Sequence, residues 1–284
     1  MTRPRSLPSY ERPPVIEVVA SVQFEPLAAA GLVHFGLLWE RFRNSFPKTE
    51  QKPPLTQVVE RLGVAPSRRG FQLSLVEEPS MARLWFVNEP GDELVQVQAD
   101  RFIRNWRAVA GLHNAYPRYD DCIRPRFEED YRTFLNFVSD ESLGSVEPNQ
   151  CELTYINHIL PNEHWKSHSD LHSVLRYWPD SASGLLSMEA EAINFGVAYR
   201  LNDDKGDFIG RLHVSAQSAF LPPRAGSDQQ VPIFVLTLTA RGRPLGKGIE
   251  GVLEFFDVGR SVIVDSFDRM TTTTMHEVWG KHHG

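Results

Sequence analysis

The order of strand and helix patterns repeats once along this 284-residue chain. In each half a strand is followed by an amphipathic helix, by a hairpin with a further strand, and by a long helix. Tandem β-α-β-β-β-α units are typical of an antiparallel sheet with its helices on one face, as in TBP-like and helix-grip modules. The order therefore predicts an α+β fold with an internal duplication, although residue identity between the halves is low.

Residues that favour turns or end helices mark the boundaries of the expected helices and strands in the first half. Pro47 ends a helix whose apolar residues recur every three or four positions, and Gly91 lies in a turn-rich segment between two strands. Short strands such as 71–76 are expected between 48 and 80. The expected strands of the main unit are 15–24, 82–87, 94–98 and 101–109, and the expected helices are 32–46 and 123–138.

The second half repeats these signals. The expected strands are 151–157, 193–201, 209–218 and 233–241, and the expected helices are 170–178 and 249–270. Thr274 and Glu277 have the spacing of a capping box for a last short helix, which Gly280 ends. The predicted core residues of the helices are Trp39, Phe42, Phe256, Ile263 and Phe267. The charged residues expected to form a solvated face are Asp257, Arg260, Asp265, Asp268 and Arg269.

This organisation divides the chain into three segments. Residues 1–13 are rich in arginine and proline and show no period, so we expect an extended N-terminal arm. Residues 14–140 are expected to form a first α+β lobe. Residues 150–284 are expected to form a second α+β lobe that includes the C-terminal helices.

Composition argues against several classes of protein. The net charge of −6 disfavours a nucleic-acid binder, which usually has an excess of basic residues. Two cysteines, Cys122 and Cys151, cannot build a disulfide framework, which favours a reducing compartment. The N-terminus lacks the apolar run of a signal peptide, and no stretch approaches the roughly 18 apolar residues of a membrane span. We therefore expect a cytoplasmic protein without membrane contact.

Arginines alternate with aromatic residues in the middle of the chain. On the expected strand Arg101 and Arg107 share one face, and Arg104 lies on the other face with Trp106. Guanidinium groups beside aromatic rings suit phosphates and stacked bases, although the acidic residues nearby can neutralise much of such a patch. The candidate residues for an anionic ligand are Arg101, Arg104, Trp106, Arg107, Arg118 and Tyr119.

Histidines cluster in the second half. His164, His168 and His172 are four residues apart, so on one continuous helix they would share a face and could bind zinc. Ser167 and Ser169 favour a helix start at this point, which places His164 before the helix and separates the three rings. A polar loop followed by a helix start is the alternative interpretation of the segment.

Three stretches spread over most of the chain form an ordered set. They are Pro13-Pro-Val-Ile-Glu-Val-Val19, Asn105-Trp106 with Tyr116-Pro-Arg-Tyr119, and the tail from Phe267 to Gly280. With this set the chain resembles a sporadically distributed family of bacterial proteins of about this length, for which no activity is established. The patchy distribution of that family implies carriage on mobile or accessory loci and favours an accessory or defence-linked role.

The chain has no G-x-S-x-G, P-loop or H-E-x-x-H motif, so no catalytic residue is singled out and no cofactor is expected. The leading hypothesis is a non-enzymatic binding or interaction protein, whose open sheet face or inter-lobe groove receives a small ligand or a protein partner encoded nearby. The alternatives are a nucleic-acid or nucleotide binder that uses the arginine and aromatic segment, and a metal-dependent hydrolase that uses the histidines.

Overall fold

The computed structural model describes residues 7–65, 83–110, 112, 115–178, 188, 190–223 and 230–282. The strands of this part are β1 (Ser9–Tyr10), β2 (Val15–Phe24), β3 (Lys48–Lys52), β4 (Arg83–Val87), β5 (Glu93–Gln98), β6 (Arg101–Arg107), β7 (Pro148–Ile159), β8 (Asn194–Asn202), β9 (Phe208–Leu221), β10 (Val231–Gly242) and β11 (Lys281–His282). The helices are α1 (Leu32–Phe42), the π-turn η1 (Tyr119–Ile123), α2 (Arg124–Asp140), the 3-10 helix η2 (His168–Ser173), α4 (Gly248–Met270) and α5 (Thr273–Val278).

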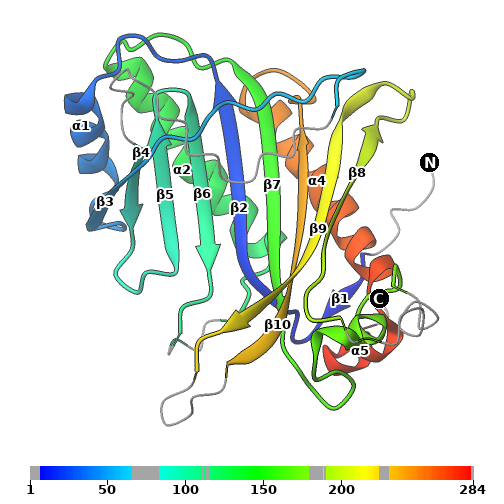
Figure 1. Cartoon of the computed structure of the whole chain (residues 1–284). Helices are drawn as coiled ribbons and strands as arrows, with labels where there is room; N and C mark the ends of the chain where they lie inside the picture. Colours follow the sequence, from blue (N-terminus) through cyan, green and yellow to red (C-terminus); the bar gives the residue numbers. More distant parts are fainter. Residues whose placement is uncertain are drawn as a thin grey trace.

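One large antiparallel sheet dominates the molecule. Its nine strands follow the order β3-β4-β5-β6-β2-β7-β10-β9-β8, so strands of the first half lie on one side and strands of the second half on the other (Figure 1). The halves meet where β2 pairs with β7. The long helices α2 and α4 lie on one face of the sheet (Figure 1). The expected α+β fold with an antiparallel sheet is therefore confirmed.

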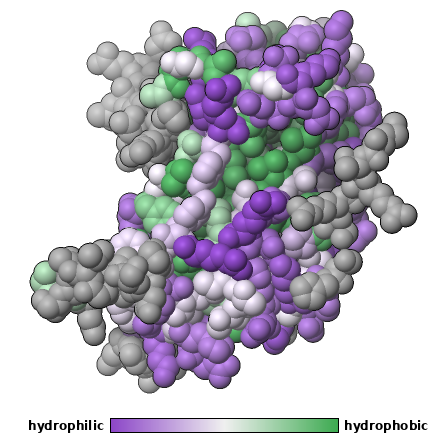
Figure 2. Space-filling model, turned by 90° about the vertical axis from the view of Figure 1, so that its right-hand side faces the viewer, coloured by the Kyte–Doolittle hydropathy of each residue, from purple (hydrophilic) through white to green (hydrophobic). Residues whose placement is uncertain are grey.

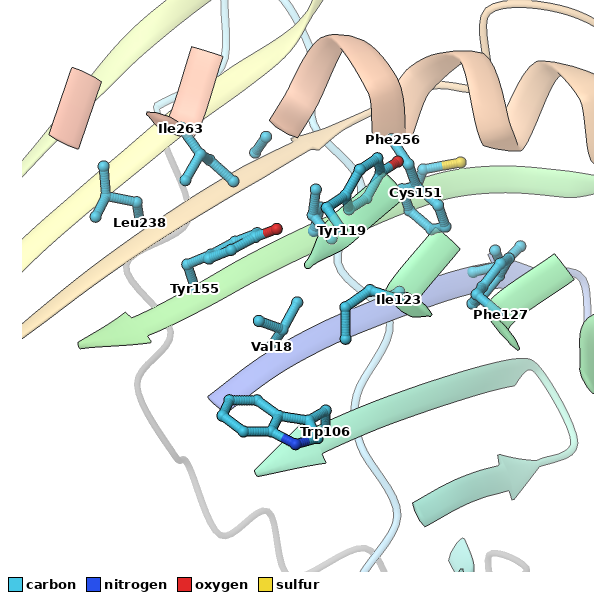
Figure 3. Packing of buried hydrophobic residues seen from close by; sticks show 14 of the residues in the cluster. Val18, Trp106, Tyr119, Ile123, Phe127, Cys151, Tyr155, Leu238, Phe256 and Ile263 are labelled. Atoms are coloured by element: carbon cyan, nitrogen blue, oxygen red, sulfur yellow. The ribbon is translucent and has the colours of Figure 1, made fainter. Parts of the chain in front are cut away.

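Side-chain alternation gives the sheet two different faces. On β2, Val18, Val22 and Phe24 are buried on the helix side, whereas Ser21 and Gln23 point to the opposite side. The helix side is filled with aromatic rings and aliphatic side chains, part of which Figure 3 shows. The opposite side is lined mainly by polar and charged side chains, and the segment after β3 crosses it (Figure 1).

Aromatic contacts join the helices to the sheet and to each other. The ring of Phe102 on β6 lies 5.3 Å from that of Phe134 on α2, and the ring of Phe127 on α2 lies 4.9 Å from that of Phe256 on α4. Phe42, Phe256, Ile263 and Phe267 are buried as expected. Trp39 is only partly buried, because its indole N–H lies near the surface and donates to the Phe46 carbonyl at 3.0 Å.

The expected elements agree with the structure except at some ends. The expected helix 170–178 is the 3-10 helix η2, which ends at Ser173 because Leu175 turns to form a bridge with Thr271. Residues 119–121, expected as loop, open the π-turn η1. The N-cap of α5 is Thr272, whose hydroxyl accepts from the Met275 amide, so the expected capping box at Thr274 is wrong. The expected strand 71–76 lies outside the described residues.

The described part of the N-terminal arm packs against the C-terminal end of the chain. β1 pairs with β11, and the buried Tyr10 hydroxyl donates to Asp268 of α4 at 2.6 Å. The Tyr10 ring also meets the rings of Phe267 and Trp279 edge-on. These contacts hold residues 8–13 beside α4 and form one wall of the site described below.

The β8 end of the sheet is less covered than the β3 end. α1 places Phe35, Leu38 and Phe42 against the first end, whereas Val197 and Tyr199 of β8 remain 39% and 36% exposed. Figure 2, which views the molecule from this side, shows an apolar hollow bordered by hydrophilic side chains. None of the described helices is both long and apolar enough to cross a membrane.

Candidate functional site

A pocket lies between the N-terminal arm, α4 and the central strands β7 and β10. Its apolar wall includes Leu238 of β10 and Ile263, Val264 and Phe267 of α4. The space between its walls is about 460 Å³ when the adjoining open solvent is included. Figure 3 shows Leu238 and Ile263 in the layer between sheet and helix, with Tyr155 of β7 close by.

Arg260 of α4 also lines the pocket, and its positive charge has no counter-ion in the described part of the chain. Its Nε and Nη1 atoms are buried and have no hydrogen-bond partner. Its Cζ atom lies 5.9 Å from the centre of the Tyr119 ring and 5.7 Å from that of Tyr155. The rings attract the cation, but they do not replace the hydrogen bonds that a guanidinium loses on leaving water.

The carboxylate one helical turn before Arg260 is engaged elsewhere. Asp257 Oδ1 accepts from the Tyr119 hydroxyl at 2.8 Å and from Arg124 Nε at 2.9 Å. The ion pair with Arg124 satisfies the Asp257 charge on the side of α4 that faces α2. Arg260 therefore keeps its charge unneutralised inside the pocket.

Two phenols provide further polar groups beside Arg260. The hydroxyls of Tyr116 and Tyr155 lie 3.0 Å apart, so one donates to the other and one O–H remains for a further acceptor. Burial raises the pKa of Tyr116, and the Arg260 charge offsets only part of that effect. Burial also raises the pKa of Tyr155 well above its usual range. Both phenols are therefore protonated at neutral pH and can donate.

Arg118 adds a second positive charge at the mouth of the pocket. Its Nη2 donates to the Tyr10 carbonyl at 2.8 Å, and its Nη1 lies 3.4 Å from the Ser9 hydroxyl, so it also fastens the arm. The residues that line the pocket include two arginines and no aspartate or glutamate. In a chain with a net charge of −6, this makes the pocket a local positive site.

The structure separates the arginines of the middle segment. As the alternation predicts, Arg101 and Arg107 lie on the face opposite the helices, where Arg101 Nη2 donates to Gln23 at 2.6 Å and Arg107 Nε donates to the Gly91 carbonyl at 2.7 Å. Arg104 lies on the helix face and forms ion pairs with Asp130 at 2.6 Å and Glu93 at 2.9 Å. These three side chains do not converge on one ligand.

The remaining candidates of that segment lie at or beside the pocket. Arg118 lines it, and the Tyr119 ring contacts Arg260. The Trp106 ring lies 5.8 Å from that of Tyr116, so it supports a residue of the lining without reaching the pocket itself. The middle segment thus contributes one positive charge to the pocket, that of Arg118, and aromatic rings that support its lining. The second positive charge is that of Arg260 on α4.

The histidines do not form a metal site within the described ranges, where no three His, Cys, Asp or Glu side chains are placed to hold a metal ion. The His168 ring lies between the carbonyls of Glu191 at 3.1 Å and Ile233 at 3.2 Å. His164 lies before η2, as the serine pattern indicates, and its ring is 3.3 Å from Glu163. The zinc hypothesis therefore gains no support.

Arg260 is the residue that sequence reasoning missed, since it was assigned to a solvated face. That prediction is wrong because Nε and Nη1 are buried. The spacing from Phe256 through Arg260 to Ile263 and Phe267 is four, three and four, which places Arg260 in the apolar stripe of the helix. An arginine at such a position was the available signal, because a charge inside an apolar stripe needs a partner.

No protein-family model, curated protein sequence or solved structure matches this chain.

Proposed function

We propose that this chain is a non-enzymatic binding protein whose pocket holds a small ligand with one anionic group. The guanidinium of Arg260 carries the proposal, because within the described structure its Nε and Nη1 have no hydrogen-bond partner and only the Tyr116 hydroxyl forms a hydrogen bond with it. A carboxylate or phosphate accepts N–H bonds from a guanidinium, so it would supply the missing charge and an acceptor for an unpartnered donor of Arg260. Arg118 at the mouth and the free O–H of the tyrosine pair provide further donors to the same anion.

The rest of the lining favours an apolar or aromatic body for the ligand. Leu238, Ile263, Val264 and Phe267 form a continuous apolar surface beside the polar groups. Pockets of this kind bury the body of a ligand against apolar side chains, and a few placed polar groups orient it. We therefore expect an aryl or branched-chain carboxylate or phosphate ester as the ligand.

The polar groups of the pocket suit binding rather than catalysis. Arginine keeps its proton at any pH that a folded protein tolerates. Burial holds the pKa values of Tyr116 and Tyr155 above their usual range, so neither phenol is a base or a nucleophile at neutral pH. These groups recognise and orient an anion without accepting a proton from it.

Calorimetric titration with phenyl phosphate, phenylacetate and neutral phenylacetamide tests the proposal. We expect at least one anion to bind, and the amide to bind at least tenfold more weakly. Arg260→Met should abolish anion binding, whereas Arg269→Met on the exposed side of the same helix should leave it unchanged. Equal binding of amide and anions, no binding of either anion to the wild type, or unchanged binding by Arg260→Met would contradict it.

The two alternative functions have less support. A nucleic-acid or nucleotide site needs neighbouring arginines on one surface, but Arg101 and Arg104 point to opposite faces and Arg104 is paired with two carboxylates. A metal-dependent hydrolase needs a converging set of ligands, and His168 is held between two carbonyls. The binding hypothesis has the buried and unpartnered Nε and Nη1 of Arg260, which belong neither to the strand arginines nor to the histidines.

We also infer that the chain arose by tandem duplication on a TBP-like or helix-grip-like plan. The strand order supports this, since β6, β5 and β4 extend outward from β2 as β10, β9 and β8 extend from β7. α2 and α4 each follow the last strand of their half. We propose in addition that residues 14–140 and 150–284 form two lobes and that the chain belongs to the sporadic bacterial family. We also propose that it acts in the cytoplasm with a protein partner from an accessory locus.

A further inference from the structure

A second polar site lies on the sheet face opposite the helices, where residues 55–60 cross the strands. We call these residues the strap, and Figure 1 shows their segment in light blue in front of the sheet. Gln98, Arg101, Gln23 and Gln150 are direct cross-strand neighbours on β5, β6, β2 and β7, so they form one row beneath the strap. All four are buried.

The row binds the main chain of the strap rather than its side chains. Gln98 forms two hydrogen bonds with one residue, as a neighbouring strand would, and each following member of the row forms one. The contacts are Leu55 N to Gln98 Oε1 at 2.9 Å, Gln98 Nε2 to Leu55 O at 2.9 Å, Arg101 Nη2 to Thr56 O at 3.1 Å, Val58 N to Gln23 Oε1 at 3.0 Å and Glu60 N to Gln150 Oε1 at 2.8 Å.

The spacing of the row fits any extended chain. The step from β5 to β7 crosses three strand intervals of about 4.8 Å each, and five residues of extended chain rise by about 3.3 Å each, which gives nearly the same span. Because the amides contact only backbone groups, the sequence of the bound segment is free at these positions.

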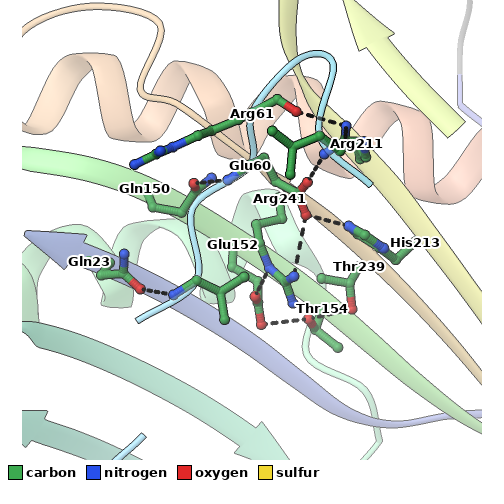
Figure 4. Close-up of polar contacts among 12 residues, drawn as sticks. Gln23, Glu60, Arg61, Gln150, Glu152, Thr154, Arg211, His213, Thr239 and Arg241 are labelled. Carbon is green, nitrogen blue, oxygen red and sulfur yellow. Dashed lines mark hydrogen bonds and ion pairs between the residues drawn. The ribbon is translucent and has the colours of Figure 1, made fainter. Parts of the chain in front are cut away.

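Two side chains of the strap also contact the rest of the protein. Gln57 Nε2 donates to the Phe24 carbonyl at 3.1 Å, and the Glu60 carboxylate meets three basic side chains. The Glu60 carboxylate lies 2.5 Å from His213 Nε2 and 3.4 Å from Arg241 Nη1. It also forms an ion pair with Arg211, as Figure 4 shows. Its side chain is 2% exposed. The three basic residues, which we call the basic trio, come from the neighbouring strands β9 and β10 and surround this carboxylate, and Arg241 Nε also pairs with Glu152 of β7 at 2.5 Å.

The strap does not form hydrogen bonds with every donor of the row. Arg101 Nε and Gln150 Nε2 are buried and have no hydrogen-bond partner in the described structure. The strap side chain of Val59 is 43% exposed, and those of Leu55 and Val58 are half-buried, so none of the three is part of the core. The face therefore offers more donors than its present occupant satisfies.

We propose that this face binds an extended acidic segment of a protein partner in the place of the strap. The row of amides holds the partner's main chain, and the basic trio holds one glutamate or aspartate side chain. Residues of the partner with polar side chains supply acceptors for Arg101 Nε and Gln150 Nε2. This site is on the opposite face from the Arg260 pocket and does not depend on the proposed function.

A fluorescein-labelled peptide with the sequence of residues 53–64 is the probe, and its binding to the full chain is measured by fluorescence anisotropy. In the wild type the strap competes from within the same molecule, so binding is weak. Glu60→Ala removes the strap carboxylate from the basic trio, and we expect this variant to bind the peptide at least tenfold more tightly. Glu50→Ala, on the exposed strand β3, is the control and should bind like the wild type.

Two further comparisons test the recognition. A peptide with glutamine at the position of Glu60 should bind Glu60→Ala at least tenfold more weakly, and Arg211→Ala in the same background should lose binding of the original peptide. If Glu60→Ala does not fold by circular dichroism, Glu60→Gln replaces it, because its amide keeps the size of the side chain but removes the charge and one of the two acceptor oxygens. No peptide binding by the folded variant, or equal binding of the glutamate and glutamine peptides, would show that the strap is a fixed part of the fold and overturn the proposal.

Discussion

At the scale of single residues, Arg260 lowers the stability of the unliganded protein and supplies the charge that we propose binds the ligand. Its buried Nε and Nη1 have no partner, and leaving such donors unsatisfied costs about 1–3 kcal/mol. The contacts with Tyr119 and Tyr155 return part of this, about 0.5–1 kcal/mol each. We expect Arg260→Met to raise the free energy of unfolding of the unliganded protein by roughly 1 kcal/mol, measured by urea titration.

The control for this prediction is Arg269→Met on the same helix. Arg269 pairs with Asp265 one turn away, and its side chain is 66% exposed, so its replacement should change stability by about 0.5 kcal/mol or less. If Arg260→Met lowers the free energy of unfolding by more than about 1 kcal/mol, the guanidinium has hydrogen-bond partners in the free protein. The main support for anion binding in the pocket would then be lost.

Glu60 gives a second prediction for a single residue, a dependence of stability on pH. Burial alone raises the pKa of Glu60, but hydrogen bonds from His213 and Arg211 and the charge of Arg241 outweigh it and lower the pKa from 4.5 to about 2. A carboxylate with a lowered pKa stabilises the folded state above its unfolded pKa, here by roughly 3 kcal/mol, and loses that effect as the pH falls towards its folded pKa.

We therefore expect the stability difference between wild type and Glu60→Gln to be constant above pH 4.5 and to shrink between pH 4.5 and about 2. Chemical denaturation of both proteins at several pH values measures this difference, and titration of the other carboxylates largely cancels in it. A difference that stays constant down to pH 3 would show that the basic trio does not hold the carboxylate.

Among the elements, α4 links the core to the pocket. Phe267 is 6% exposed and contacts the rings of Tyr10 at 5.6 Å and Trp279 at 5.1 Å. Phe267→Ala should lower the free energy of unfolding by about 3–5 kcal/mol, because it leaves a cavity where the arm and α5 meet the helix. Leu37→Ala on the exposed side of α1 should cost less than about 1 kcal/mol in the same urea titration. Equal losses in the two variants would contradict this packing.

The helices and strands also show which features of the fold sequence patterns can predict. The ends of β6 and α2 agree with the expected ranges within a few residues, because alternation and helical spacing are local properties. The segment after β3 has no period, and its path across the sheet follows from hydrogen bonds to glutamines far away in sequence. Patterns over a few neighbouring residues cannot predict such long-range contacts.

The molecule as a whole is built on one continuous sheet. The pairing of β2 with β7 runs from Val15 to Phe24, and the rings of Phe127 and Phe256 join the long helices of the two halves. We expect a single unfolding transition in urea, with coincident curves for tryptophan fluorescence and far-ultraviolet circular dichroism. Two separated transitions would show that residues 14–140 and 150–284 unfold independently.

The α+β class, the order of the elements and the buried stripes of the helices follow from the amino-acid order, because side-chain period and turn residues act over a few positions. Both candidate sites depend on tertiary structure. Arg260 meets Tyr116 and Tyr155, and Glu60 meets Arg211, only because the strands are ordered as they are in the sheet. Whether a charged side chain is solvated or buried without a partner is likewise decided by residues distant in sequence, since only they supply or withhold the counter-ion.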